Sequence, residues 1–194
     1  MKFRGFFASR SKPKKPKSIA REIIETVVIS GVLAIFIITF VVQSFVVKGQ
    51  SMEPSFSNGE RLFVNKFIYR FTEPERGDVI IFTPDGAPQD KFIKRVVGLP
   101  GETVKIEDGK VWIDGKLLQE NYVEVPITDK SGTYKVPEDH VFVLGDNRHP
   151  FASSDSRYPS PVGFVNYKSI AGKAFITYWP VPNIRLVSEA KYEN

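Results

Sequence analysis

A run of 22 residues without a charged side chain, from Thr26 to Val47, constrains the fold of this chain more than any other feature. In a helix, about 20 apolar residues rising roughly 1.5 Å each cross a hydrocarbon core of roughly 30 Å. This length favours a membrane span over a buried core helix, and it exceeds the roughly 7–15 apolar residues of a cleaved signal peptide. We therefore expect a retained membrane anchor over residues 22–47.

The basic residues are concentrated before this run. Eight of the 27 Lys and Arg residues lie in residues 1–21, which contain no acid, so 19 bases face 22 acids over residues 22–194. Because loops rich in Lys and Arg remain cytoplasmic, we expect a cytoplasmic tail over 1–21, a single pass through the plasma membrane, and an extracytoplasmic domain over 48–194. Membrane lipid is an expected partner. Binding to nucleic acid is disfavoured, because the bases do not outnumber the acids in residues 22–194.

After the run, short β-branched and aromatic stretches alternate with turns, which is typical of strands. Asp108-Gly109 and Asp114-Gly115 predict hairpin turns, and Leu99-Pro100-Gly101 predicts a type II turn. We expect a mostly β domain, either a curled antiparallel sheet or a partly open barrel, with an irregular loop over 150–161. The stretches are RLFVNKF, DVIIF, FIKRVVG, TVKI, KVWI, YKVP, HVFVLG and KAFITYW.

A turn of small residues around Ser51 is the first candidate for chemistry. The sequence Gly49-Gln50-Ser51-Met52-Glu53-Pro54-Ser55 can expose a hydroxyl and direct backbone N–H groups at one point, as acyl transfer requires. Serine beside Gly and Pro is also ordinary loop composition. The turn alone therefore leaves catalysis and a simple loop both open.

The stretch from Asp90 to Gly98 is the second candidate, because it mixes bases with apolar residues. Full burial can lower the pKa of a lysine by up to roughly 3–5 units, leaving a neutral amine that accepts a proton from a serine. The alternative is a surface lysine whose stem covers apolar neighbours. With Lys91, Lys94 and Arg95 in one stretch, we expect most of the three to lie at the surface.

Acids, bases and hydroxyls are dense from Gly145 to Arg157, which predicts a hydrogen-bonded network supporting a site rather than direct chemistry. A Ser-His-Asp triad would have to use His140 or His149, and His149 lies near Asp146 and Asp155 in the sequence. Two histidines without metalloprotease spacing give little support for a metal site. Cysteine is absent, which excludes disulfides and a cysteine nucleophile.

Taken together and in this order, the apolar run and the segments GQSMEPS, RGDVIIF, DKFIKRVVGLPGE and GDNRHPFASSDSR resemble the bacterial type I signal peptidases, in the compact form found in bacilli. The resemblance implies a membrane-bound serine endopeptidase that needs no cofactor and cuts secreted preproteins after a small-x-small signal. It also implies that Ser51 is the nucleophile and Lys94 the general base. The protein secretion machinery is expected to be nearby.

Further positions carry over from the same motifs. Ser153 matches the hydroxyl that orients the lysine amine, although the inserted His149–Phe151 leaves Ser154 as an alternative. At Gly49 the chain departs from enterobacterial-type members, which carry a serine whose hydroxyl helps to form the oxyanion hole. The resemblance assigns a supporting polar network to Asp146, Arg148, Asp155 and Arg157, and substrate-pocket walls to Val47, Met52, Phe92 and Ile93.

Two other functions remain open from the sequence. A membrane-tethered β module that binds peptides without cutting them would share the anchor and the strands. A Ser/Lys protease related to self-cleaving repressors would share the catalytic pair, but the apolar run and the absence of a basic body disfavour it.

Overall fold

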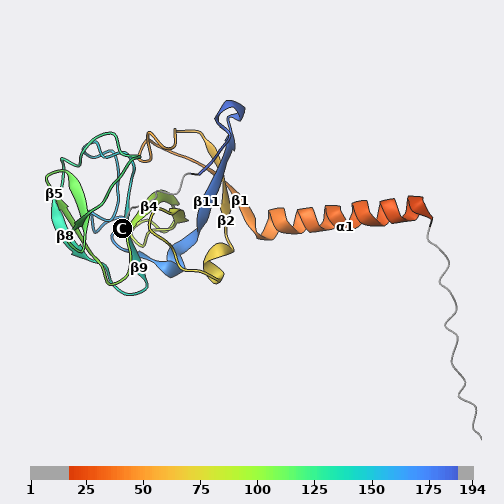
Figure 1. The fold of residues 1–194 in the computed structure, drawn as a ribbon, viewed down its shortest axis with the longest axis horizontal. Coiled ribbons are helices and arrows are strands. Elements are labelled where there is room, and N and C mark those ends of the chain that lie inside the picture. The colour runs from red at the N-terminus through yellow and green to blue at the C-terminus, as the bar shows by residue number, and fades with distance from the viewer. Residues whose placement is uncertain (1–17, 188–194) are drawn as a thin grey trace, which may run out of the picture. The chain divides into compact units, whose positions relative to one another are not determined.

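The computed structural model describes residues 18–187, apart from the side chains of residues 38–40. The predicted cytoplasmic tail over residues 1–21 therefore lies outside the described residues, except for 18–21. Two compact units make up the chain, one ending at Ile37 and the other beginning at Ile38. Figure 1 shows a helix and a β-rich body, and each unit is considered by itself below.

The first unit contains most of helix α1, Ile19–Phe40. Ser18 begins it as an N-cap, because its carbonyl and its hydroxyl both accept the N–H of Arg21. Arg21 pairs with Glu25 one turn later at 2.9 Å. From Val27 to Ile37 the large apolar side chains are exposed. Among the described residues, no helix has both the length and the apolar character needed to cross a membrane.

Helix α1 ends seven residues before the predicted end of the anchor, which was expected over residues 22–47. The helix stops at Phe40, and Val42–Val46 form strand β1, which pairs with β2, Arg61–Asn65, over five residues. β-Branched and aromatic residues suit a pleated strand, and β2 supplies the main-chain partners that a membrane helix would find within itself. Val47, expected to close the anchor, is buried in the core of the second unit.

A large antiparallel sheet dominates the second unit. Its strand order is β1-β2-β11-β3-β4-β9-β10, with β12 pairing with β11, and in Figure 1 strands β1, β2 and β11 lie side by side. The order is that of an open path, so β1 and β10 have one partner each within the described chain. The other bounds are Val79–Phe82 for β3, Phe92–Gly98 for β4, His140–Leu144 for β9, Val165–Asn166 for β10, Ile170–Trp179 for β11 and Arg185–Leu186 for β12.

A smaller sheet has the order β7-β6-β5-β8. Both predicted hairpin turns are confirmed: Asp108 and Gly109 join β5 to β6, Asp114 and Gly115 join β6 to β7, and all four residues have positive φ. The predicted turn at Leu99–Gly101 is also present, with Gly101 at φ +76°. The bounds are Thr103–Glu107 for β5, Lys110–Ile113 for β6, Lys116–Leu117 for β7 and Gly132–Lys135 for β8.

Between residues 50 and 187 the helical elements are short 3-10 helices. They are Ile68–Arg70 (η1), Tyr167–Ser169 (η2) and Val181–Asn183 (η3). The predicted irregular loop over 150–161 has neither helix nor strand. The mostly antiparallel β architecture expected from the sequence is therefore confirmed.

Strand β4 contributes to all three apolar clusters of this unit. Ile93 packs in the cluster beneath the Ser51 turn, Val97 in the cluster between the two sheets, and Val96 in the third cluster. Every residue of β4 except Phe92 is buried. The strand that carries Lys94 is consequently fixed by packing on both faces.

The packing between the sheets can be tested with two phenylalanines. Phe142 is 0% exposed and contacts Tyr134 and Phe164, whereas Phe151 is 85% exposed. We expect Phe142→Ala to lower the free energy of unfolding by about 3–5 kcal/mol, because it leaves a cavity. Phe151→Ala should change it by less than about 0.5 kcal/mol. Denaturant unfolding of the full chain in detergent measures both, and equal effects would contradict the proposed packing.

Candidate active site

The turn that carries Ser51 is held at both ends by the second unit. The N–H of Val47 donates to the carbonyl of Glu60, and the N–H of Gly59 donates to the carbonyl of Val47. Met52 and Phe56 are buried beneath the turn, and the Phe56 N–H closes it onto the Met52 carbonyl at 2.9 Å. Ser51 itself stays partly exposed. The turn is thus anchored by its apolar residues and presents its serine outward.

Lys94 meets Ser51 although 43 positions separate them in the sequence. Its Nζ lies 2.7 Å from Ser51 Oγ and donates to the carbonyl of Ile93 at 2.9 Å. The side chain is almost completely buried, with 2% of the residue exposed. Burial lowers the pKa of Lys94 to about 8, against the charges of Asp155 and Asp146, which raise it. The neutral amine is therefore a minor form near neutral pH and becomes the major form above pH about 8.

Ser153 is buried beside this pair, but its hydroxyl has no hydrogen-bond partner within the described residues. The hydrogen bond to the Lys94 amine that the resemblance implied is therefore not formed in this structure. A methyl group on Gly145 would lie 2.3 Å from Ser153 Oγ and 2.4 Å from the Ser51 carbonyl oxygen. The absence of a side chain at Gly145 lets these segments pack together. The alternative residue, Ser154, is exposed.

Behind the pair, the predicted polar network consists of bidentate ion pairs. Asp146 binds Arg95, with both side chains at most 2% exposed, and Asp155 binds Arg157 at 2.8 Å.

The network extends to acids outside the predicted set. Arg148 pairs with Glu120 at 2.6 Å and donates to the carbonyl of Gly145. Arg157 also pairs with Asp129, which accepts a hydrogen bond from Tyr158. Such pairs are tolerated in a core only when their donors and acceptors are satisfied, as they are here.

Three members of this network were not predicted from the sequence: Arg95, Glu120 and Asp129. The expectation that most of the bases in the β4 stretch lie at the surface was wrong, because Lys94 and Arg95 are buried and only Lys91 is exposed. The sequence did contain an indication that Arg95 is buried, because Ile93 and Val97, which lie on the same face of the strand, are apolar. Glu120 and Asp129 come from the loop between β7 and β8, 28 residues before their arginine partners, and no local pattern marks them.

A cavity of about 600 Å³ opens in front of Ser51 and Lys94. Of the four predicted wall residues, Phe92 and Ile93 line it, whereas Val47 and Met52 do not line it and pack in the core instead. The cavity also borders the end of β1, whose outer edge has no partner strand within the described chain. Its remaining lining comes from Phe45, Val46, Lys48, Gly49, Gln50, Gln89, Asp90, Lys91, Ala152 and Ser154.

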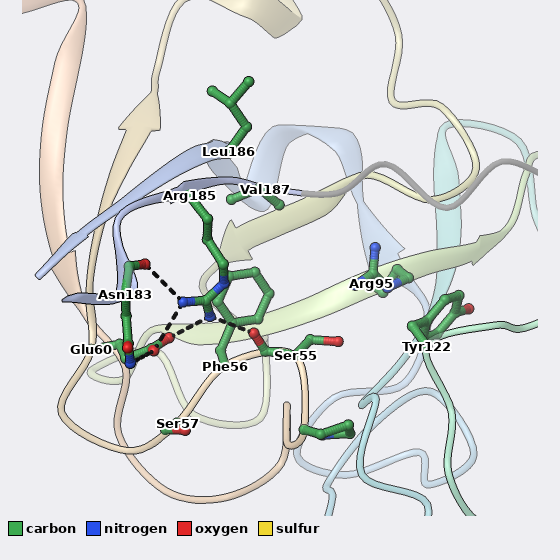
Figure 2. Close-up of a pocket in the computed structure, with 11 residues that line it drawn as sticks. Ser55, Phe56, Ser57, Glu60, Arg95, Tyr122, Asn183, Arg185, Leu186 and Val187 are labelled. Carbon is green, nitrogen blue, oxygen red and sulfur yellow. Dashed lines mark hydrogen bonds and ion pairs between the residues drawn. The ribbon is translucent and has the colours of Figure 1, made fainter. Parts of the chain in front are cut away.

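A second cavity, of about 480 Å³, is lined by residues 54–57, which follow Ser51 in the turn (Figure 2). Arg185 reaches from β12 to pair with Glu60 at 2.7 Å and donates to the Ser55 carbonyl at 2.6 Å. Asn183 also donates to Glu60. In Figure 2 the Arg185 guanidinium lies against the ring of Phe56. The segment around β12 therefore holds the turn at Ser55 and Glu60.

The histidine and metal alternatives receive no support from the described residues. Neither imidazole forms a hydrogen bond with Ser51: His140 contacts the Glu138 carbonyl and Asn166, and His149 is exposed. No group of three or more His, Cys, Asp or Glu residues within 18–187 could hold a metal ion. The basic side chain that the structure places within hydrogen-bond distance of Ser51 Oγ is that of Lys94.

Comparisons with known proteins agree with the motifs. The family described as "Signal peptidase, peptidase S26" matches residues 20–179. The chain is 40% identical to "Probable signal peptidase I-2" of Synechocystis sp., over 93% of this chain and 83% of that protein. It is 36% identical to "Signal peptidase I" of Bacillus licheniformis, over 91% and 98%.

Among solved structures, a signal peptidase I from Enterococcus faecalis V583 is 36% identical, with a TM-score of 0.45, and covers 53% of this chain and 97% of that chain. The family predicted from the four motifs is confirmed by the family match and by relatives that include the Bacillus form. The chain therefore belongs to the signal peptidases of family S26.

Proposed function

We propose that this chain is a type I signal peptidase, a membrane-bound serine endopeptidase that removes N-terminal signal peptides from secreted preproteins after a small-x-small motif. The observation that carries the proposal is the buried Lys94 amine, 2.7 Å from the hydroxyl of Ser51, in a chain of this family. A hydroxyl and an amine in this arrangement have the parts needed for acyl transfer.

The proposed reaction proceeds in two steps. Neutral Lys94 accepts the Ser51 proton while Oγ attacks the scissile carbonyl, and the resulting ammonium gives that proton to the leaving amine as the C–N bond breaks. An acyl-enzyme and the free N-terminus of the mature protein result. Lys94 then accepts a proton from water, which attacks the ester, and returns it to Ser51 Oγ. The Ser51 N–H, which has no partner among residues 18–187, is available to the developing oxyanion.

The cavity beside β1 suits an extended peptide. The free outer edge of β1 offers main-chain groups to an added strand, in which alternate side chains face the same way. Phe92 and Ile93 would then limit the volume available to the side chains that enter the cavity. A small-x-small preference follows from such an arrangement, because only alternate residues need to be small.

The remaining site residues have supporting roles in this proposal. Asp146, Arg148, Asp155 and Arg157 fix the loop that packs on Lys94 and Ser51. Ser153, buried next to the pair with its hydroxyl unused, would orient the Lys94 amine once substrate occupies the cavity.

The proposal includes attachment to the plasma membrane through α1. Its exposed apolar side chains and the bases that precede it in the sequence support this, with the N-terminus cytoplasmic and the catalytic unit extracytoplasmic. Signal peptides are also delivered at the membrane, close to the secretion machinery. Attachment there would raise the effective concentration of substrate.

Removing either member of the pair should abolish cleavage. We expect Ser51→Ala and Lys94→Met to lower kcat at least about 1000-fold, because each removes a group that acts with the other. Met approximates the volume of Lys without an amine. The measurement is cleavage of a preprotein by the full chain in detergent. Ser131→Ala and Lys168→Met, both exposed, serve as controls and should retain activity. Retained cleavage in Ser51→Ala would point instead to a peptide-binding module.

The pH dependence of kcat/KM should report the pKa of the Lys94 amine. Only neutral Lys94 can accept the Ser51 proton, so activity should fall about tenfold per pH unit on the acid side. The midpoint of this limb should lie near the Lys94 pKa of about 8. Lys168→Met should leave the midpoint unchanged. A midpoint near 6.5, the ordinary histidine value, that disappears in His149→Ala would contradict the assignment of Lys94 as the base.

Membrane attachment can be tested separately from catalysis. We expect the full chain to stay in the membrane pellet after extraction at alkaline pH. A double variant, Leu33→Arg with Phe36→Arg, should be released, because each charge in the apolar part of α1 costs about 2.5–3.5 kcal/mol in a bilayer. Digestion of the catalytic unit by protease added outside intact spheroplasts tests the orientation. Release of the wild-type chain from the membrane at alkaline pH would argue against a membrane anchor.

A further inference from the structure

Asn147 holds the main chain on both sides of the Ser51 α-carbon. Its side-chain Nδ2 donates to the Gln50 carbonyl at 2.9 Å, and its own N–H donates to the Ser51 carbonyl at 3.1 Å. The Oδ1 atom accepts the N–H of His149 at 3.1 Å. Because Oδ1 is engaged in this way, the amide presents its donor end to Gln50.

This contact fixes the direction of the Ser51 N–H. The Gln50–Ser51 peptide is not among the cis bonds of the described chain, and in a planar trans peptide the N–H points opposite to the carbonyl. The Gln50 carbonyl also accepts the Glu53 N–H at 3.1 Å, so both of its lone pairs are used. The Ser51 N–H is therefore held pointing away from Asn147, and it has no hydrogen-bond partner among residues 18–187.

Asn147 and Ser51 line different cavities next to the turn. Asn147 lines a cavity of about 310 Å³ that does not include Ser51. Ser51 lines the cavity of about 600 Å³ in front of Lys94, which does not include Asn147. A donor directed away from Asn147 points away from a residue of the smaller cavity, and Ser51 itself shares the larger cavity with Lys94.

We propose that Asn147 is a positioning residue, which orients the Ser51 N–H as the donor that stabilises the oxyanion of the tetrahedral intermediate. When Ser51 Oγ adds to the substrate carbonyl, the carbonyl π electrons move to oxygen, and the Ser51 N–H donates to that charge. Gly49 has no side chain that could add a donor, so the direction of this N–H matters more in this chain. The inference rests on the proposed catalytic role of Ser51.

The structure provides variants that separate this role from folding. Asn147→Ala and Asn147→Asp remove the Nδ2 donor, but the Asn147 N–H keeps its bond to Ser51. In the Asp variant an oxygen replaces the donor opposite the Gln50 carbonyl, which repels that carbonyl. The matched control is Asn166→Asp, since the Asn166 Oδ1 likewise accepts the N–H two residues later, that of Lys168, at the start of η2.

The experiment measures preprotein cleavage and inhibitor binding with the full chain in detergent. For both Asn147 variants we expect kcat to fall about 10–100-fold while KM changes less than about threefold, since an oxyanion donor acts in the transition state. Affinity for a peptide aldehyde, which adds Ser51 Oγ to give a hemiacetal oxygen at the oxyanion position, should fall by the same factor. Binding of the cleaved signal peptide and the pH midpoint of Asn147→Ala should not change.

Several results would overturn the inference. A kcat within threefold of wild type in both variants would show that the Nδ2 contact is dispensable. Equal losses of aldehyde and product affinity, or a shifted pH midpoint in Asn147→Ala, would indicate general disruption of the site. A loss in Asn166→Asp as large as in Asn147→Asp would have the same meaning. Ser51→Ala is assayed in parallel, because activity in that variant would refute the proposed function itself.

Discussion

The burial of the Lys94 amine against Ser51 is the interaction on which the rest of the site depends. Burial lowers its pKa, whereas the carboxylates of Asp155 and Asp146 act in the opposite direction. Each of these acids is bound by a guanidinium, Arg157 and Arg95 respectively. Desolvation outweighs the attraction of these two carboxylates, so the pKa of the amine is lowered overall. The network behind the pair thus has an electrostatic role as well as a structural one.

The Ser51 turn receives its rigidity from segments distant in sequence. Asn147 binds it at Gln50, Arg185 binds it at Ser55, and Met52 and Phe56 pack beneath it. A loop would ordinarily lose precision through its own mobility, and each of these contacts removes part of that freedom. The sheet fixes Lys94 independently through β4. Two separately fixed elements are needed because the hydroxyl and the amine must meet without adjusting either backbone.

Local patterns in the sequence predicted most of the fold and part of the site. Strands such as β4 follow from β-branched and aromatic residues, and turns such as Asp108-Gly109 follow from the need for positive φ, so neighbouring residues suffice to predict both. The segment Val42–Val46 could not be assigned in the same way, because an apolar β-branched run fits a membrane helix as well as a strand. Glu120 and Asp129 could not be predicted, because only folding brings them close to Arg148 and Arg157. The core positions of Val47 and Met52 likewise depend on which side of the turn faces the sheet.

Gly145 shows why motif spacing alone cannot establish the geometry of such a site. Its missing side chain leaves room for the Ser51 carbonyl and for Ser153, both of which a methyl group would meet at less than 2.5 Å. Its N–H and carbonyl contact Asp155 and Arg148, so the same residue links the nucleophile turn to the ion-pair network. A displacement of the polar loop would therefore reach Ser51 through backbone contacts, without any change in Lys94. Precision at the hydroxyl thus depends on close backbone packing as much as on the residues that carry the chemistry.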